Sequence, residues 1–174
     1  MKKVVFIGYM GCGKSLISKE LGVQINIRCL DLDNVIENYA RKSITDLFKS
    51  KGELYFRKLE NELLKEILNA NESLILSTGG GTPCYYNNIE IINNPDVTSV
   101  YLKASIETLF ERLVSEKNKR PLISNFDDAD LKEFIAKHLF ERSFYYNQAK
   151  YIINVDTKSI EEIITELKNI IYSK

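Results

Sequence analysis

One short loop near the start of the chain constrains the fold more than any other stretch. Residues 8–15 read GYMGCGKS, which matches the pattern G-x-x-x-x-G-K-[ST], and they directly follow the apolar run VVFI at residues 4–7. The run predicts a buried strand, and the apolar spacing after the loop predicts a short helix that ends at Gly22. Glycines in this position let successive backbone N–H groups point into one concavity, to which the helix N-terminus adds its positive end. The pattern therefore predicts a phosphate-binding loop in which Lys14 contacts the β- and γ-phosphates and the Ser15 hydroxyl binds Mg²⁺.

Apolar and β-branched runs predict the rest of the sheet. We expect five strands, at residues 4–7, 25–30, 74–76, 97–102 and 151–155. Amphipathic spacing predicts a helix over residues 54–68, Ser105 is the expected N-cap of a helix that runs through Val114, and Ser159 with Glu162 forms a capping box that opens the last helix. Strands that alternate with helices indicate an α/β fold, a five-stranded parallel sheet flanked by helices.

A second glycine cluster lies at the same edge of this expected sheet. Gly79, Gly80 and Gly81 directly follow the third predicted strand, and the two clusters together hold six of the eight glycines. Ligands of parallel α/β sheets bind at the carboxyl ends of the strands. Both clusters are therefore expected to bring backbone close to a ligand.

Composition excludes several classes of protein. The 174 residues suit one domain over residues 1–174, and 24 basic side chains balance 24 acidic ones, which removes the electrostatic case for a nucleic-acid or anionic-membrane partner. No apolar run reaches a membrane-spanning length. Three widely spaced cysteines and a single histidine, His138, favour reduced thiols over a zinc site. We expect a cytoplasmic protein, and a monomer.

A phosphate loop alone does not define a reaction. The chain has no N-K-x-D guanine-reading motif of a GTPase, and it is too short for an ATPase motor. A small kinase remains, and its acceptor site must come from other residues.

Carboxylates and arginines supply candidates for that acceptor site. Asp31 and Asp33 form D-L-D at the end of the second predicted strand, where alternation places both on one face, one for the Mg²⁺ shell and one for a substrate hydroxyl. The alternative is a helix cap with a solvated neighbour. Arg57 and Glu60 lie three residues apart on a helix, where a surface ion pair is the simplest interpretation.

Two further arginines follow late in the chain. Arg120 lies in the polar stretch at residues 116–130, EKNKRPLISNFDDAD, which is either a solvated loop or a mobile lid, and Arg142 lies in Glu141-Arg142-Ser143. Each arginine, taken alone, fits a surface position better than a site.

Taken together, these residues resemble the shikimate kinase family, P-loop kinases of the nucleoside-monophosphate-kinase fold with a mobile lid. The resemblance covers nearly the whole chain and rests on the GYMGCGKS loop, D-x-D at Asp31 and Asp33, F-R-x-x-E at Arg57 and Glu60, S-T-G-G-G ending at Gly81, R-P-L at Arg120 and E-R-x-x-x-Y around Arg142. It implies transfer of the ATP γ-phosphoryl group to the 3-hydroxyl of shikimate, in aromatic amino-acid biosynthesis.

The resemblance also implies a role for each matching position. Asp33 would contact the acceptor hydroxyl, and Lys14 and Arg120 would stabilise the transferred phosphoryl group. Arg57 and Arg142 would hold the substrate carboxylate, with backbone contacts from Gly79, Gly80 and Gly81. Ser15 and Asp31 would serve Mg²⁺. ATP would contact Gly11, Cys12, Gly13, Lys14, Ser15, Leu16, Arg112 and Arg120, with residues 155–159 as the adenine loop.

Some residues depart from the family pattern or stay unassigned. Cys12 stands where the family more often has a small uncharged residue, and the charges of Lys117 and Lys119 have no assigned role. His138 is expected on a helix surface, and Tyr145 and Tyr146 are not assigned to the site.

Three other functions compete with this interpretation. A gluconate kinase also binds a polyhydroxy acid, and a nucleoside monophosphate kinase can use two arginines to bind an acceptor phosphate. A non-catalytic ATP-binding regulator is the rival from another class, but the presence of both Lys14 and Asp33 speaks against it.

Overall fold

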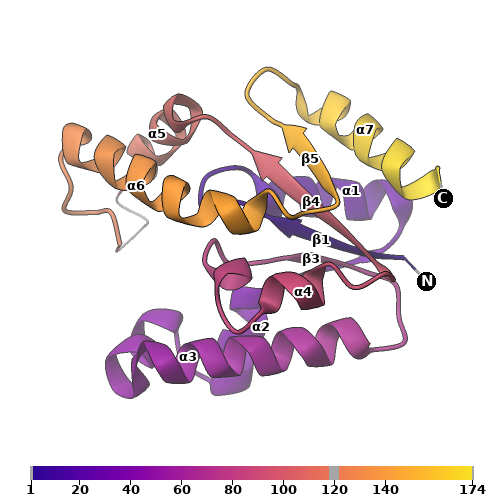
Figure 1. Cartoon of the computed structure of the whole chain (residues 1–174), viewed down its shortest axis with the longest axis horizontal. Coiled ribbons are helices and arrows are strands. Elements are labelled where there is room, and N and C mark those ends of the chain that lie inside the picture. Colours follow the sequence, from indigo (N-terminus) through magenta and orange to yellow (C-terminus); the bar gives the residue numbers. More distant parts are fainter. Residues whose placement is uncertain (1, 118–121, 174) are drawn as a thin grey trace.

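The computed structural model describes residues 2–117 and 122–173. The elements in chain order are β1 (Lys3–Ile7), α1 (Lys14–Ile25), β2 (Arg28–Asp31), α2 (Leu32–Ala40), α3 (Ile44–Asn69), β3 (Leu74–Ser77), the 3₁₀ turn η1 (Thr82–Cys84), α4 (Asn88–Ile92), β4 (Val97–Lys103), α5 (Ile106–Val114), α6 (Asp128–Tyr146), β5 (Tyr151–Asn154) and α7 (Ile160–Tyr172) (Figure 1). The five strands form one parallel sheet in the order β2-β3-β1-β4-β5. The predicted fold class is confirmed.

The central strands are buried on both faces, as their continuous apolar sequences require. Every residue of β1 and β3 is buried. Helix α1 packs against β2, β3 and α7, whereas α4 packs against β4 and α3. Helices α1 and α7 lie across the sheet from α3 and α4 (Figure 1). Over the described part of the chain, no helix is both long and apolar enough to span a bilayer.

The register of the sheet brings three loops to one edge. Phe6 of β1 and Asp31 of β2 both pair with Ser77 of β3. The segments that follow these strands are the loop at residues 8–15, called the phosphate-type loop from here on, the start of α2 and the second glycine cluster. Because all strands are parallel, their carboxyl ends meet at the same edge, which places these segments side by side.

The first predicted helix and second predicted strand have different bounds in the structure. Gly22 does not end α1, which continues to Ile25 and stops at Asn26, a residue in the left-handed region at φ 52°. Strand β2 starts only at Arg28. Gly22 is buried at the crossing of α1 and β2, where an added Cβ would clash with Cys29 Sγ and lie 2.8 Å from Ile27 O. This glycine serves close packing rather than helix termination.

The other predicted elements are found with small changes at their ends. The helix expected at residues 54–68 is the second part of α3, which contains a break at Gly52 (φ 82°). Ser105 caps α5, which ends at Val114, and Ser159 and Glu162 form the capping box of α7. The last strand ends at Asn154, one residue earlier than expected.

The stretch expected to form a lid is only partly irregular. Asp127 caps α6 and the helix begins at Asp128, so the acidic end of residues 116–130 belongs to a helix start. Lys117 Nζ lies 2.6 Å from the Asp128 carboxylate, which gives that lysine a role in joining the two ends of the stretch. Arg120 and Lys119 lie outside the described residues.

We predict that Gly22→Ala lowers the free energy of unfolding by about 1–3 kcal/mol, because a methyl group inserted at this crossing forces α1 away from β2. The urea midpoint measures the change. Val23→Ala is the matched control, since Val23 is 80% exposed on the same helix, and it should change stability by less than about 0.5 kcal/mol. A Gly22→Ala protein with the wild-type midpoint would contradict the packing role.

Candidate active site

A cleft of about 570 Å³ opens at the carboxyl edge of the sheet. The structure brings most of the predicted site residues to its walls: Gly11, Cys12, Gly13, Lys14, Ser15, Leu16, Asp31, Asp33, Gly79, Gly80 and Arg112. Gly81 adjoins the cleft through Gly80, and Arg57 and Arg142 lie against Gly81 and Gly80. Residues far apart in the sequence thus form one site.

The phosphate-type loop runs from β1 into the first turn of α1. Gly8, Gly11 and Gly13 have φ of 144°, 83° and 100°, a region that side-chain-bearing residues rarely adopt. Lys14 Nζ donates to Gly8 O at 2.7 Å and to Tyr9 O at 3.0 Å, so the ammonium group is folded back over the loop. The first turn of α1 presents its free N–H groups to the cleft, which is the geometry of an anion site.

Asp31 and Asp33 reach the cleft by a route that strand alternation does not predict. The strand ends at Asp31, and Leu32 begins α2, so Asp33 lies in the first helical turn. The expectation of two side chains on one face of a strand was wrong. Asp31 is the helix cap, accepting from the Asp33 N–H at 3.1 Å, and its other oxygen accepts from Ser15 Oγ at 3.0 Å. The cap therefore also joins β2 to the phosphate-type loop.

Asp33 has an unusual protonation equilibrium. Burial, with the charges of Asp31 and Glu60 next in weight, raises its pKa from 3.8 to about 6, against the opposing effect of Lys14. Its Oδ1 lies 3.0 Å from the position that a Cβ on Gly79 would occupy. A carboxylate with a pKa near neutrality, directed at the glycine cluster, is suited to hold or accept a proton from a hydroxyl group in the cleft.

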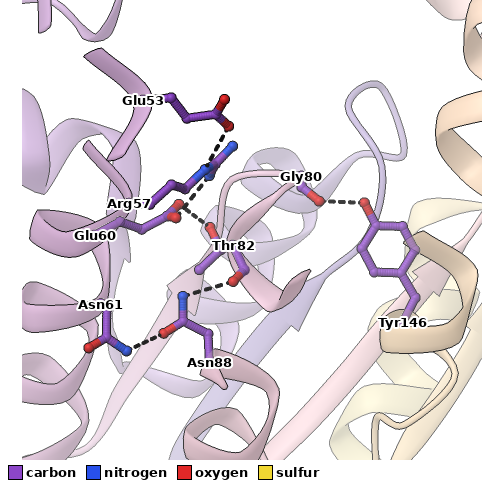
Figure 2. A network of polar contacts seen from close by, with 8 residues as sticks. All are labelled: Glu53, Arg57, Glu60, Asn61, Gly80, Thr82, Asn88 and Tyr146. Atoms are coloured by element: carbon purple, nitrogen blue, oxygen red, sulfur yellow. Dashed lines mark hydrogen bonds and ion pairs between the residues drawn. The ribbon is translucent and has the colours of Figure 1, made fainter. Parts of the chain in front are cut away.

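Arg57 and Glu60 form a buried pair, not a surface pair. The Glu60 side chain is 1% exposed, accepts from Arg57 Nη1 at 2.9 Å and accepts from Thr82 Oγ1 at 2.6 Å. Figure 2 shows this chain of contacts from α3 to η1. The Arg57 guanidinium also lies 4.1 Å from the centroid of the Tyr85 ring. Burial lowers the pKa of Arg57, but the charge and hydrogen bond of Glu60, with smaller effects of Tyr85 and Glu53, together raise it above its ordinary value.

Two guanidinium groups lie against the glycine cluster. A Cβ on Gly81 would lie 2.7 Å from Arg57 Nη2, and one on Gly80 would lie 3.3 Å from Arg142 Nη1. Arg142 comes from α6, and its Cζ lies 5.6 Å from the centroid of the Tyr9 ring. Among the residues that the structure describes, no carboxylate pairs with Arg142. A Cβ at Gly81 would displace the Arg57 guanidinium, and one at Gly80 would crowd that of Arg142, so the absence of side chains lets both cations approach the backbone.

The nucleotide side of the cleft contains the other predicted residues. Arg112 Nη1 donates to Gly11 O at 3.2 Å, which holds this arginine against the phosphate-type loop. Val155 and Lys158, from the segment expected to contact adenine, line the same cleft, and Lys158 forms an ion pair with Glu166. Arg120 cannot be placed because it lies outside the described residues.

Sequence reasoning missed several residues that support the site. Glu60 was noted only as a partner on the helix surface, and Tyr146, fully buried, donates to Gly80 O at 2.5 Å. His138 is half-buried, with Nδ1 3.4 Å from the Tyr9 hydroxyl, and so lies against the loop rather than on an open helix surface. The signal for Tyr146 was its spacing of four residues from Arg142, which places both on one face of a helix.

The family model that matches this chain and the similar proteins named below are those of shikimate kinases. The family model for shikimate kinase matches residues 10–172. The shikimate kinase of Flavobacterium johnsoniae is 52% identical, with 98% of this chain and 99% of that protein covered. The shikimate kinase of Flavobacterium psychrophilum is 46% identical, with 99% and 100% covered.

Solved structures agree with the sequence relatives. The crystal structure of shikimate kinase from Bacteroides thetaiotaomicron superposes with a TM-score of 0.90 at 35% identity over 97% of each chain. Shikimate kinase from Acinetobacter baumannii, in complex with shikimate, superposes with a TM-score of 0.87 at 26% identity over 99% of this chain and 94% of that one. Together with the phosphate-type loop and the paired aspartates in one cleft, and two arginines against the adjoining glycine cluster, these matches show that the chain belongs to the shikimate kinase family.

Proposed function

We propose that this protein transfers the γ-phosphoryl group of ATP to the 3-hydroxyl of shikimate, giving shikimate 3-phosphate and ADP. One observation carries the proposal: two guanidinium groups, Arg57 and Arg142, flank a glycine turn that also faces Asp33, at the end of a cleft that contains a phosphate-binding loop. A small acid with hydroxyl groups matches this arrangement of charges. The relative from Acinetobacter baumannii was solved with shikimate bound, which supports the same acceptor here.

The arginines would bind the carboxylate of the acceptor. A guanidinium group is planar, permanently charged and able to donate two parallel hydrogen bonds to a carboxylate. Glu60 holds Arg57 from the buried side, so little side-chain entropy remains to be lost on binding. Arg142, free of a described carboxylate partner, would contribute an unneutralised charge. The N–H groups of Gly79, Gly80 and Gly81 would complete the acceptor site.

Asp33 would act on the reacting hydroxyl. As the hydroxyl oxygen bonds to the γ-phosphorus, the bond from that phosphorus to the bridging oxygen of ADP breaks, and the hydroxyl proton passes to the Asp33 carboxylate. A pKa of about 6 makes this group ionised at neutral pH yet basic enough to take the proton. Loose transition states of this kind depend mainly on positioning and on neutralisation of charge.

The donor side would be held by the loop and by Mg²⁺. Lys14 and the first turn of α1 would neutralise the phosphates, and Arg120 would approach from the lid. Ser15 Oγ and Asp31 Oδ2 are hard oxygen donors 3.0 Å apart, which suits Mg²⁺, an ion that keeps several waters and takes its other ligands from substrate phosphates. When bound, Mg²⁺ neutralises charge on the β- and γ-phosphate oxygens.

The setting of the enzyme is part of the proposal. Cys12, Cys29 and Cys84 are free thiols, which supports a reducing compartment such as the cytoplasm. We also propose that residues 1–174 act as one monomeric domain with a lid near residue 120.

The direct test measures ADP release from Mg-ATP with shikimate, gluconate and AMP in parallel. Turnover with shikimate alone is the expected result. Turnover with gluconate or AMP would retain the phosphate-loop argument and refute the assignment of the arginines to the shikimate carboxylate.

Arg57→Lys should raise the KM for shikimate by tens of fold, because one point charge replaces a forked, pre-oriented pair of donors worth about 1.5–3 kcal/mol. The KM for ATP should stay unchanged in the same coupled assay. Arg28→Lys is the matched control, since Arg28 is exposed and, among the described residues, pairs only with Glu72, at 3.3 Å. An unchanged shikimate KM in Arg57→Lys would remove Arg57 from the acceptor site.

Asp33→Asn should lower kcat by roughly 10²–10⁴ while ATP binding is retained, because the amide cannot accept the proton. For the wild type, kcat/KM for shikimate should fall as pH drops through about 6. Near-normal turnover of the variant would refute the assignment.

The same substitution should stabilise the fold at alkaline pH. Because the folded-state pKa is raised from 3.8 to about 6, the proton contributes stability that is complete below pH 3.8 and lost as pH rises through 6. Asp33→Asn escapes this loss. Its advantage in unfolding free energy should be about 1–3 kcal/mol at pH 8 and should vanish towards pH 4. Urea unfolding at both pH values measures it, and an equal difference at both would exclude ionisation as the cause.

A further inference from the structure

Tyr146 has a contact that packing alone does not require. It is the last residue of α6, is fully buried and lies with its ring centroid 5.1 Å from that of Tyr101. Its hydroxyl donates to Gly80 O at 2.5 Å, across 66 positions of sequence (Figure 2). Burial raises the pKa of the phenol far above its usual value, so the hydroxyl remains a donor over the whole working range of pH.

The backbone of the glycine cluster explains why this donor is needed. In the turn that leads into η1, Thr82 N donates to Gly79 O at 3.2 Å and Cys84 N donates to Gly81 O at 2.9 Å. By the same spacing, Gly80 O would accept from residue 83. That residue is Pro83, which has no N–H. The middle carbonyl of the cluster, which is half-buried, is thus left without its backbone donor, and a shielded carbonyl without a partner is costly.

Tyr146 also lies next to the arginine assigned to the substrate. Arg142 precedes it by four residues, one turn of α6, and Arg142 Nη1 lies against Gly80. The charge of Arg142 opposes the effect of burial on the Tyr146 phenol, which places the two groups close together. The hydroxyl therefore joins the helix turn that carries Arg142 to the backbone that Arg142 faces.

We propose that Tyr146 is a positioning residue of the acceptor site, whose hydroxyl supplies the hydrogen bond that Pro83 cannot donate. The bond fixes the peptide plane of Gly80 and holds the Arg142 turn of α6 at a constant distance from it. This inference rests on the proposed function, because the groups that it positions are those assigned to the acceptor.

Tyr146→Phe removes the hydroxyl and keeps the ring. We expect the KM for shikimate to rise about tenfold, the loss of one well-oriented hydrogen bond, while kcat and the KM for ATP stay within about twofold. Tyr101→Phe is the matched control, because it removes a buried phenol from the same ring pair without touching Gly80, and its shikimate KM should equal that of the wild type. A Tyr146→Phe enzyme with lowered melting temperature but wild-type shikimate KM would show a purely structural role and overturn the proposal.

A second substitution tests whether the effect of Tyr146→Phe comes from the loss of the donor to the Gly80 carbonyl. Pro83→Ala restores an N–H three residues after Gly80. In the Tyr146→Phe background it should bring the shikimate KM back to within about threefold of the wild type, whereas alone it should change the KM little. A double variant as impaired as Tyr146→Phe would refute the link through the Gly80 carbonyl.

The failure of the proposed function would be seen separately. If the wild type phosphorylates gluconate or AMP instead of shikimate, the proposed function is wrong. The wild type and the four variants are then assayed with the substrate that the wild type accepts. A selective rise in its KM for Tyr146→Phe, reversed by Pro83→Ala, would still support the positioning role. A KM equal to that of the wild type would overturn it.

Discussion

The acceptor half of the structure depends on one carboxylate that has no contact with water. Glu60 is fully buried, and it is tolerated there because Arg57 neutralises its charge and the Thr82 hydroxyl occupies its second oxygen. Removal of one partner from such a pair typically costs about 3–5 kcal/mol. The interaction therefore fixes α3, η1 and the intervening glycine turn together. Arg57 Nε also donates to Glu53 at 3.4 Å, and Nη2 lies against Gly81, so one side chain serves both the fold and the proposed site.

Negative charge is crowded at this end of the sheet, and the proposed role of Asp33 gives the crowding a chemical use. Asp31, Asp33 and Glu60 lie close enough for each neighbour to raise the pKa of Asp33, and Lys14 only partly compensates. The fold thus holds a carboxylate that it would be more stable without at neutral pH. Carboxylates whose pKa is raised by burial and by neighbouring negative charges are common at sites where a group must exchange a proton near pH 7. The paired charges around Arg57 and Glu60 supply the rigidity that keeps the unfavourable one in place.

The elements and caps that depend on neighbouring residues could be predicted from the sequence. Those that depend on contacts between distant segments could not. The strand–loop–helix setting of Lys14, the strands apart from the start of the second, and the caps at Ser105 and Ser159 follow from short patterns and were confirmed. The bounds of α1 were wrong because Gly22 is set by its approach to Cys29, a tertiary contact. Asp33 reached the cleft through a helix turn instead of a strand, since the cap at Asp31 begins α2 earlier than alternation suggests.

The position of proline gives a reason why the proposed acceptor site would draw on two helices. An ordinary turn would satisfy all three glycine carbonyls from its own backbone and could be placed independently of the rest of the chain. With Pro83 in the turn, Gly80 must take its donor from elsewhere, and α6 supplies it through Tyr146. The helix that brings the second arginine is therefore the helix that completes the turn. The turn of α6 that carries Arg142 cannot move away from the glycine cluster without breaking this hydrogen bond, and the bond holds two distant segments in register before any substrate arrives.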